Sequence, residues 1–336
     1  MTCYRSVSAG VDGSYPRRFL HHLIVWPVKR GKSGHGLDHR RRGDEHAGNS
    51  TETCMRFPSL PIALLTISFF WLAGPRPASG CDLPQDTRAP SADEPTMLKR
   101  FVKECLLVTP GKGRFPATAL VGQSPARPHE RARTEVRMGA AFRISRYETT
   151  QELYTAIMGG NPSRWQGPRN SVERMTIAAA RKFCRRLTER LQAEKLISNE
   201  QVVRLPTDVE WEYCCRAGTK TRFHFGDEVG ESEETDRLDA VAWHTGNAAG
   251  NDPAVGVLKP NAWGLFDMHG YLWEFVESPN GRDETKATIR GGSWRDRHPL
   301  LSSASYLTVP ASETGDHIGF RCVIAEKEAG KKATNQ

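Results

Sequence analysis

The sequence lacks a hydrophobic run long enough to cross a lipid bilayer. Its most apolar stretch extends from Leu60 to Ala73, about fourteen residues, whereas a membrane-spanning helix needs roughly twenty. The 336-residue chain also contains no internal repeat and only short low-complexity segments. These absences argue against a membrane-spanning protein and a repeat architecture. They leave one sizeable domain with accessory segments as the expected organisation.

A concentrated basic region is missing as well. The formal net charge at pH 7 is +8, and residues 1–54 hold nine Lys or Arg against five Asp or Glu, so they account for +4 of it. The other +4 is spread over the remaining 282 residues. Because nucleic-acid binding requires clustered positive charge, we expect no nucleic-acid partner.

Residues 1–54 show no periodicity that would bury one face of a helix or strand, and they contain five of the eleven histidines. A better beginning follows at Met55, where one early positive charge precedes the apolar run and small residues occupy positions 78–80. This order is typical of a secretory signal peptide. We predict that translation starts at Met55, that residues 1–54 are a spurious or unstructured extension, and that residues 55–80 are the signal peptide.

Cys81 directly follows the small residues, an arrangement that also resembles a bacterial lipoprotein box. The mature chain is therefore expected outside the cytoplasm, either secreted or periplasmic, or tethered to a membrane through a lipid on Cys81. Six cysteines follow Met55 and could form disulfides there, but their pairing cannot be deduced from the sequence. Cys214 and Cys215 are adjacent on a predicted helix, where we expect them to be small buried hydrophobic side chains.

The organisation of the mature chain follows from its composition. Residues 81–100 are rich in Pro, Asp and Ala and are predicted to be a linker. One domain is predicted over residues 101–326, beginning with a strand in FVKECLLV, and residues 327–336 are predicted to be a disordered tail.

Three helices are expected in the first half of this domain. ETTQELYTAIMGG predicts a helix stopped by Gly159, and apolar residues at spacings of three and four predict a longer amphipathic helix capped by Thr176. Thr207, with the glutamate three residues on, forms a capping box for a third helix that ends near Gly218. From Thr219 onward there are only short apolar runs, aromatics and glycines. The expected fold class is α+β with little regular secondary structure.

The stretch GLFDMHGYLWEF, residues 264–275, contains two acids seven positions apart, Asp267 and Glu274. Gly264 and Gly270 make a helix through this run costly, so the acids are expected in a loop. Spaced carboxylates with free carbonyls between them are what a hard cation such as calcium selects. The alternative is a surface acid and a capping acid around an aromatic core plug.

Six short motifs occur in an order that resembles the formylglycine-generating enzyme family, also called the sulfatase-modifying factor domain. They are YETTQELY, NPS, RLPTDVEWEYCCRAGT, NAWGLFDMHGYLWEF, IRGGSW and DHIGFR, and they extend over about residues 102–325. The resemblance implies an α+β variant of the C-type lectin fold that is poor in regular structure.

The resemblance also implies a calcium loop over the acid pair. Its ligands would be the side chain of Asp267, the carbonyls of Gly270 and Leu272, and the side chain of Glu274. Family members more commonly have Asn at the position of Tyr271. Because that departure touches no proposed ligand, calcium is the expected metal.

The chemistry of the family depends on two cysteines just after the GGS motif, which bind copper in the active form. In this chain those positions fall on Asp296 and Leu301. Soft Cu(I) requires thiolates, which neither residue supplies, so copper is not expected. Ser293 matches a serine beside that active site, and Ser302 and Tyr306 stand where many members carry arginines. For Arg290 and Arg321, which remain, we expect a packing role.

Three functions follow as hypotheses. The first is a calcium-stabilised binding or accessory module that acts on an extracytoplasmic protein or peptide and meets a membrane only if Cys81 is lipidated. The second is an oxidoreductase that converts a sulfatase cysteine to formylglycine through another thiol near Ser293. The third is a different enzyme in the same pocket, with Asp296 and His298 as acid and base. Ser293, Asp296 and His298 are the candidate catalytic residues, and no other is predicted. The absence of a cysteine pair favours the first hypothesis.

Overall fold

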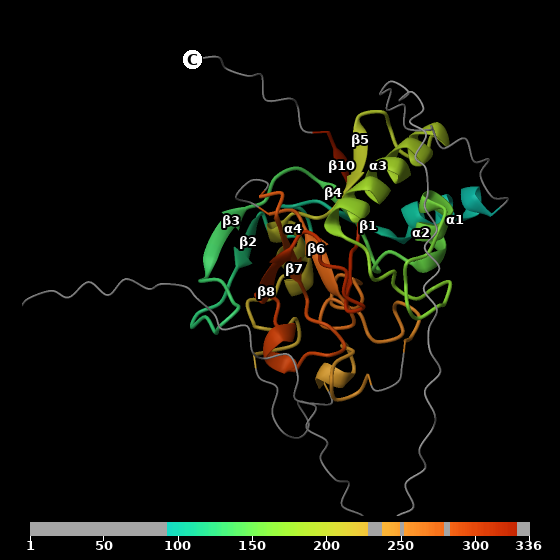
Figure 1. Ribbon diagram of the computed structural model, residues 1–336. Coiled ribbons are helices and arrows are strands. Elements are labelled where there is room, and N and C mark those ends of the chain that lie inside the picture. Colours follow the sequence, from blue (N-terminus) through green and yellow to red (C-terminus); the bar gives the residue numbers. More distant parts are fainter. Residues whose placement is uncertain (1–92, 228–236, 249–251, 279–282, 328–336) are drawn as a thin grey trace, which may run out of the picture. The chain divides into compact units, whose positions relative to one another are not determined.

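The computed structural model describes residues 93–227, 237–248, 252–278 and 283–327 (Figure 1). The predicted extension, signal peptide and all but one residue of the predicted tail lie outside these ranges. In chain order the elements are α1 Glu94–Glu104, β1 Cys105–Val108, β2 Thr118–Val121, β3 Thr134–Arg137, β4 Phe142–Ser145, α2 Gln151–Met158, α3 Ile177–Ala193, β5 Gln201–Arg204, α4 Asp208–Arg216, β6 Trp273–Val276, β7 Lys286–Arg290, the 3-10 helix η1 His298–Leu301, β8 Tyr306–Pro310, β9 Ile318–Gly319 and β10 Val323–Glu326.

These strands form two four-stranded sheets and one hairpin-like pair. The first sheet has the order β1-β4-β10-β5, all antiparallel, and the second has the order β8-β7-β6-β9, in which only β6 and β9 run parallel. Strands β2 and β3 pair separately. Because β9 and β10 are close in the chain but belong to different sheets, the C-terminal segment links the two. The mixture of short strands and helices confirms the expected α+β class.

The predicted linker over residues 81–100 is wrong at its C-terminal end. Residues 94–100 belong to α1, and the strand predicted to begin at Phe101 begins only at Cys105. Pro95 is tolerated in the first turn, because its missing N–H would have no partner there. Leu98 and Phe101, three positions apart, are both buried against the domain. This helical spacing was obscured by the acidic, proline-containing composition around it.

The other helices begin and end where the sequence predicts. α2 stops at Gly159, which has a left-handed φ of 84°. The hydroxyl of Thr176 accepts a hydrogen bond from the backbone of Ala179 at the start of α3. Thr207 and Glu210 form the reciprocal capping box of α4. After Gly218, the described residues up to Leu272 are mainly turns and irregular backbone, as expected.

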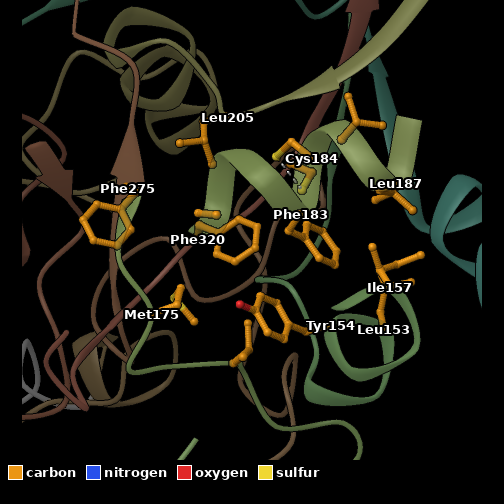
Figure 2. Packing of buried hydrophobic residues seen from close by; sticks show 14 of the residues in the cluster. Leu153, Tyr154, Ile157, Met175, Phe183, Cys184, Leu187, Leu205, Phe275 and Phe320 are labelled. Carbon is orange, nitrogen blue, oxygen red and sulfur yellow. Dashed lines mark hydrogen bonds between the residues drawn. The ribbon is translucent and has the colours of Figure 1, made fainter. Parts of the chain in front are cut away.

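The main core lies where α3 packs on α2 and β5 (Figure 2). The ring of Phe183 stacks on Tyr154 at 5.4 Å between centroids and meets Phe320 edge-on at 5.3 Å. Cys184 and Cys322 lie in the same cluster. A second cluster surrounds α4 and includes Cys214 and other buried side chains. Cys214 and Cys215 are fully buried in the second cluster, as predicted. None of the described helices is long and apolar enough to cross a bilayer.

Candidate functional site

The GGS turn after β7 positions the residues of the suspected active site. Gly291 and Gly292 have φ values of 99° and 76°, which side chains rarely adopt. A Cβ on Gly291 would lie 3.0 Å from the Trp211 ring, and one on Gly292 would lie 3.0 Å from the Leu300 carbonyl oxygen. Both positions therefore require glycine, and the turn that they form buries Ser293 completely.

The carboxylate of Asp296 is held by that turn. Its Oδ2 accepts hydrogen bonds from the Ser293 hydroxyl at 2.6 Å, from the Ser293 backbone N–H at 2.9 Å and from the Trp273 indole at 2.8 Å. Three donors on one oxygen orient the carboxylate and stabilise its charged form. Asp296, which the resemblance places at the first cysteine position, is thus an acid held in a fixed orientation.

Leu301, which the resemblance places at the second cysteine position, is fully buried. It packs in a small apolar cluster with Phe223, Leu238, Val241 and Ala242. An isobutyl group in a closed apolar cluster can neither ligate a metal nor exchange electrons, so the pocket implied by the family resemblance is filled at this point.

His269 is a buried residue of this site that the sequence analysis did not single out. Its Nδ1 lies 2.7 Å from the Leu301 carbonyl oxygen and its Nε2 lies 3.3 Å from the His224 backbone nitrogen. This pattern fits a neutral imidazole that donates through Nδ1 and accepts through Nε2. Burial, followed by the neighbouring His224 and Arg216, lowers the pKa of His269 to about 3. Its signal in the sequence was weak, because it stands among the aromatics of GLFDMHGYLWEF.

The thiol of Cys215 lies close to this imidazole, with its Sγ 3.8 Å from both ring nitrogens of His269 and 3.4 Å from the Ser303 hydroxyl. A cysteine beside a histidine can be a nucleophile when the thiolate is stabilised. Here burial raises the pKa of Cys215 to about 12, and the pKa of His269 is low. The pair therefore stays neutral at physiological pH and contributes packing.

His298 does not complete an acid–base pair with Asp296. It is exposed at the start of η1, and among the described residues no hydrogen bond or ion pair joins the two side chains. Partial burial lowers the pKa of His298, and the nearby Arg127, His244 and Arg297 lower it further. Asp296 faces inward and His298 faces solvent, so the structure does not bring this candidate acid and base together.

The predicted calcium ligands lie around β6. Asp267 has a left-handed φ of 56°, and its buried Oδ2 accepts from the Gly256 N–H at 2.8 Å. Its Oδ1 is buried without a hydrogen-bond partner. Burial raises the pKa of Asp267 to about 6. Gly270 has a φ of 91° and donates its N–H to the Gly291 carbonyl, which ties the loop to the GGS turn.

Glu274 is already paired in this structure. Arg321 donates to both carboxylate oxygens at 2.6 and 2.7 Å, and the Trp211 indole donates to Oε2 at 2.9 Å. All three side chains are fully buried. Glu274 therefore offers a cation only the lone pairs that these donors leave free.

A third buried carboxylate, Glu148, belongs to the same cluster. Its Oε1 accepts from the Leu272 N–H at 3.2 Å, and its Oε2 accepts from the Ser171 hydroxyl. Burial, followed by the charges of Glu274 and Asp267, raises the pKa of Glu148 well above its ordinary value. Three buried carboxylates thus interact electrostatically with the guanidinium of Arg321, and that of Glu274 is bonded to it.

This excess of negative charge and the unpartnered Oδ1 of Asp267 fit a hard cation, which would also take backbone carbonyls as ligands. The fit is partial, because Glu274 is bound to Arg321. No group of three or more His, Cys, Asp or Glu side chains in the described ranges is arranged to hold a metal ion.

The positions where the family carries arginines are filled differently. The Ser302 hydroxyl donates to Glu130 at 2.8 Å, and the same carboxylate oxygen accepts from Arg222 at 3.2 Å, so a guanidinium reaches this spot from another segment. The guanidinium carbon of Arg131 lies over the Tyr306 ring, 4.5 Å from the centroid of that ring.

The two retained arginines have the packing role that was predicted. Arg290 is buried and binds Asp208 at 2.6 Å and Glu212 at 3.2 Å. Arg321 uses its remaining N–H groups on the carbonyls of Ser145, Arg146 and Phe266. Both guanidinium groups are buried and bonded to groups of the protein itself.

Comparison with known proteins agrees with this fold. The chaperone protein LppX of Paenibacillus barcinonensis is 29% identical over 200 residues, which cover 46% of this chain and 69% of LppX. The formylglycine-generating enzyme of Mycobacterium tuberculosis is 29% identical over 157 residues, covering 36% of this chain and 50% of the enzyme. The inactive C-alpha-formylglycine-generating enzyme 2 of Bos taurus is 29% identical over 131 residues, covering 35% and 43%.

Among solved structures, the Treponema denticola variable protein 1 superposes with a TM-score of 0.54 at 21% identity, over 65% of this chain and 94% of that one. At this identity the likeness establishes the fold alone. Residues 92–326 match the sulfatase-modifying factor enzyme 1-like domain. This match covers most of the chain, which therefore belongs to the sulfatase-modifying factor enzyme 1-like domain family, as the six sequence motifs indicated.

Proposed function

We propose that this protein is an extracytoplasmic member of the family that does not make formylglycine and instead binds another polypeptide as an accessory module. One observation supports the proposal. Of the two residues that the resemblance places at the cysteine positions, Asp296 has its carboxylate bound by Ser293 and Trp273, and Leu301 is buried in an apolar cluster. Without a thiolate pair, the site cannot bind Cu(I) or cycle between thiol and disulfide states.

Two relatives support an accessory role. One carries the name of a chaperone protein and another that of an inactive enzyme. The chain spans half or less of the enzyme relatives that it matches, so their activities do not transfer to it as whole proteins. The expected signal peptide over residues 55–80 supports a secreted or periplasmic location, and Cys81 would allow a lipid tether. Because one fold commonly hosts several functions, the function has to be inferred from the residues of the site.

Calcium is part of the proposal as a stabilising ion. The unpartnered buried oxygen of Asp267 and the surplus of carboxylates around Arg321 support it. When bound, the ion would supply positive charge to a cluster that is otherwise negative. The chain's own part would be to present Asp267, the carbonyls of Gly270 and Leu272, and the free lone pairs of Glu274.

The test is a direct assay of the missing chemistry. The mature chain is incubated with copper, oxygen and a peptide that carries the sulfatase-type Cys-x-Pro-x-Arg motif, and the peptide mass is followed. An active formylglycine-generating enzyme serves as positive control. We expect no conversion. Conversion of cysteine to formylglycine above the level of a blank without protein would refute the proposal, because it would require a thiol or metal site that Asp296 and Leu301 do not provide.

A further inference from the structure

Exposed arginines line the rim of the turn that carries Asp296. At one end, Asp316 binds two of them: Arg295 at 2.6 Å and Arg164 at 3.3 Å. Their side chains remain 44% and 58% exposed, respectively, so most of their N–H donors stay available to a ligand. Asp316 thus holds two guanidinium groups in place without saturating them.

Each of these arginines covers a tryptophan. The guanidinium of Arg164 lies 4.6 Å from the centroid of the Trp165 ring, and that of Arg295 lies 4.8 Å from the Trp294 ring. Trp165 is 46% exposed. The Trp294 indole donates to the Asp316 carbonyl at 3.2 Å. Stacking and hydrogen bonding restrict these side chains before a partner arrives, which lowers the entropic cost of binding.

At the other end of the rim, Arg297 and Arg127 are exposed, and the positive charge of each contributes to lowering the pKa of His298. Arg127 comes from a distant loop, which two contacts bind to the segment after η1. The His129 carbonyl accepts from the Tyr306 N–H at 2.9 Å, and Glu130 accepts from Ser302. The fold therefore gathers arginines from three separate parts of the chain.

In the described part of the chain, ion pairs engage only two of these four arginines. Among the described residues, Asp316 pairs with Arg164 and Arg295, and no acidic side chain pairs with Arg127 or Arg297. Asp296 is turned inward to Ser293 and Trp273. We call the set of Arg127, Arg164, Arg295 and Arg297 with Trp165 and Trp294 the cationic rim.

We propose that the cationic rim is the docking surface for the partner polypeptide and that the partner presents an acidic segment with aromatic side chains. This rests on the proposed accessory function. Tryptophan and arginine are the residue types that dominate binding energy at protein interfaces, and complementary charge speeds encounter and selects the partner. The rim also disfavours the arginine of a sulfatase-type Cys-x-Pro-x-Arg motif, because like charges repel across the interface.

The experiment measures binding of a fluorescein-labelled peptide of alternating Glu and Phe, with a Lys-for-Glu analogue as the charge control. The test variant is R127Q/R295Q/R297Q. The matched control variant, R143Q/K182Q/R185Q, removes three exposed positive charges from β4 and α3. We expect the Glu peptide to bind the parent, the Kd to rise at least tenfold in the test variant and less than twofold in the control, and the Lys analogue not to bind. Trp165→Ala should also weaken binding several-fold.

Equal effects of the two triple variants would overturn the proposal, since only net charge would then matter. Absence of binding to the parent would overturn it as well. Tighter binding of a heparin oligosaccharide than of the Glu peptide, with the same dependence on the arginines, would replace the polypeptide partner by a polyanionic glycan. None of these outcomes depends on the formylglycine assay. Failure of the docking surface is therefore distinguishable from failure of the accessory function.

Discussion

Both carboxylate oxygens of Glu274 are bound by one guanidinium, with Nη2 of Arg321 2.6 Å from Oε1 and Nε 2.7 Å from Oε2. The pair is fully buried and joins β6 to the segment between β9 and β10. Since β9 belongs to one sheet and β10 to the other, this ion pair lies at the junction of the two sheets. It also occupies part of the loop expected to bind calcium.

Replacing Arg321 should destabilise the protein strongly. Arg321→Met leaves Glu274 charged and buried without its partner, which typically costs about 3–5 kcal/mol. Urea-induced unfolding measures the loss. The exposed Arg185→Met is the control and should change the free energy of unfolding by no more than about 0.5 kcal/mol. A loss below about 1 kcal/mol in Arg321→Met would show that Glu274 has another counter-charge in solution.

Calcium should raise the thermal stability of the parent protein. A cation bound at Asp267 stabilises the folded state alone, so Tm should increase with calcium concentration and fall on adding a chelator. Asp267→Ala should abolish this dependence, whereas Asp283→Asn, at an exposed acid, should keep it. An identical Tm of the parent with calcium and with chelator would remove the metal from the proposed function.

Acidification should destabilise the protein through His269. Its pKa is lowered to about 3 in the folded state, so below about pH 6.5 the unfolded chain takes up a proton that the folded protein excludes. The contribution of His269 to the free energy of unfolding is intact above pH 6.5. It is lost as the pH falls toward 3, at up to about 1.4 kcal/mol per pH unit. His224, whose pKa is lowered to about 4, acts in the same direction.

The raised pKa of Asp267 acts in the opposite direction, because the folded state gains a proton there. The difference between the parent and His269→Asn therefore isolates the histidine. We expect the variant to lose less stability than the parent between pH 6.5 and 5 in chemical denaturation at each pH. Parallel curves for the two proteins would mean that His269 is protonated in the folded state.

We expect a disulfide bond between Cys184 and Cys322 to form when the protein is exported to an oxidising compartment. Their Sγ atoms lie 3.9 Å apart in the core, on α3 and just before β10. Oxidation would transfer two electrons and release two protons to an oxidised disulfide such as that of glutathione. Burial raises the pKa of Cys184, so the bond should form during folding rather than afterwards.

Peptide mapping of the exported protein without reductant should find the two cysteine peptides joined, with a mass two hydrogens lower than that of the free thiols. Reductant should then lower the Tm of the parent but not of Cys184→Ser, because the bond restricts the unfolded chain. Cys105→Ser serves as the control and should retain the link. Two free thiols in the exported protein would contradict this pairing.

Local signals made much of the fold predictable. The capping box at Thr207, the glycine stop at Gly159 and the spacing of apolar residues in α3 are short-range patterns, and each specified its helix. The order of six motifs indicated the family. The error at α1 arose because Asp, Pro and Glu at its start resemble a linker, while its burial depends on Leu98 and Phe101 meeting distant elements.

The family resemblance places the cysteine pair at Asp296 and Leu301, and the sequence by itself determined that neither residue supplies a thiolate. Only the tertiary structure decided what these residues do instead, because Asp296 is bonded to Trp273 of β6 as well as to Ser293 in its own turn, and Leu301 packs in the cluster around Phe223. The same holds for His269, Glu148 and the cationic rim. Their burial and their partners depend on contacts between residues far apart in the chain. The spacing of residues along the sequence does not encode such contacts.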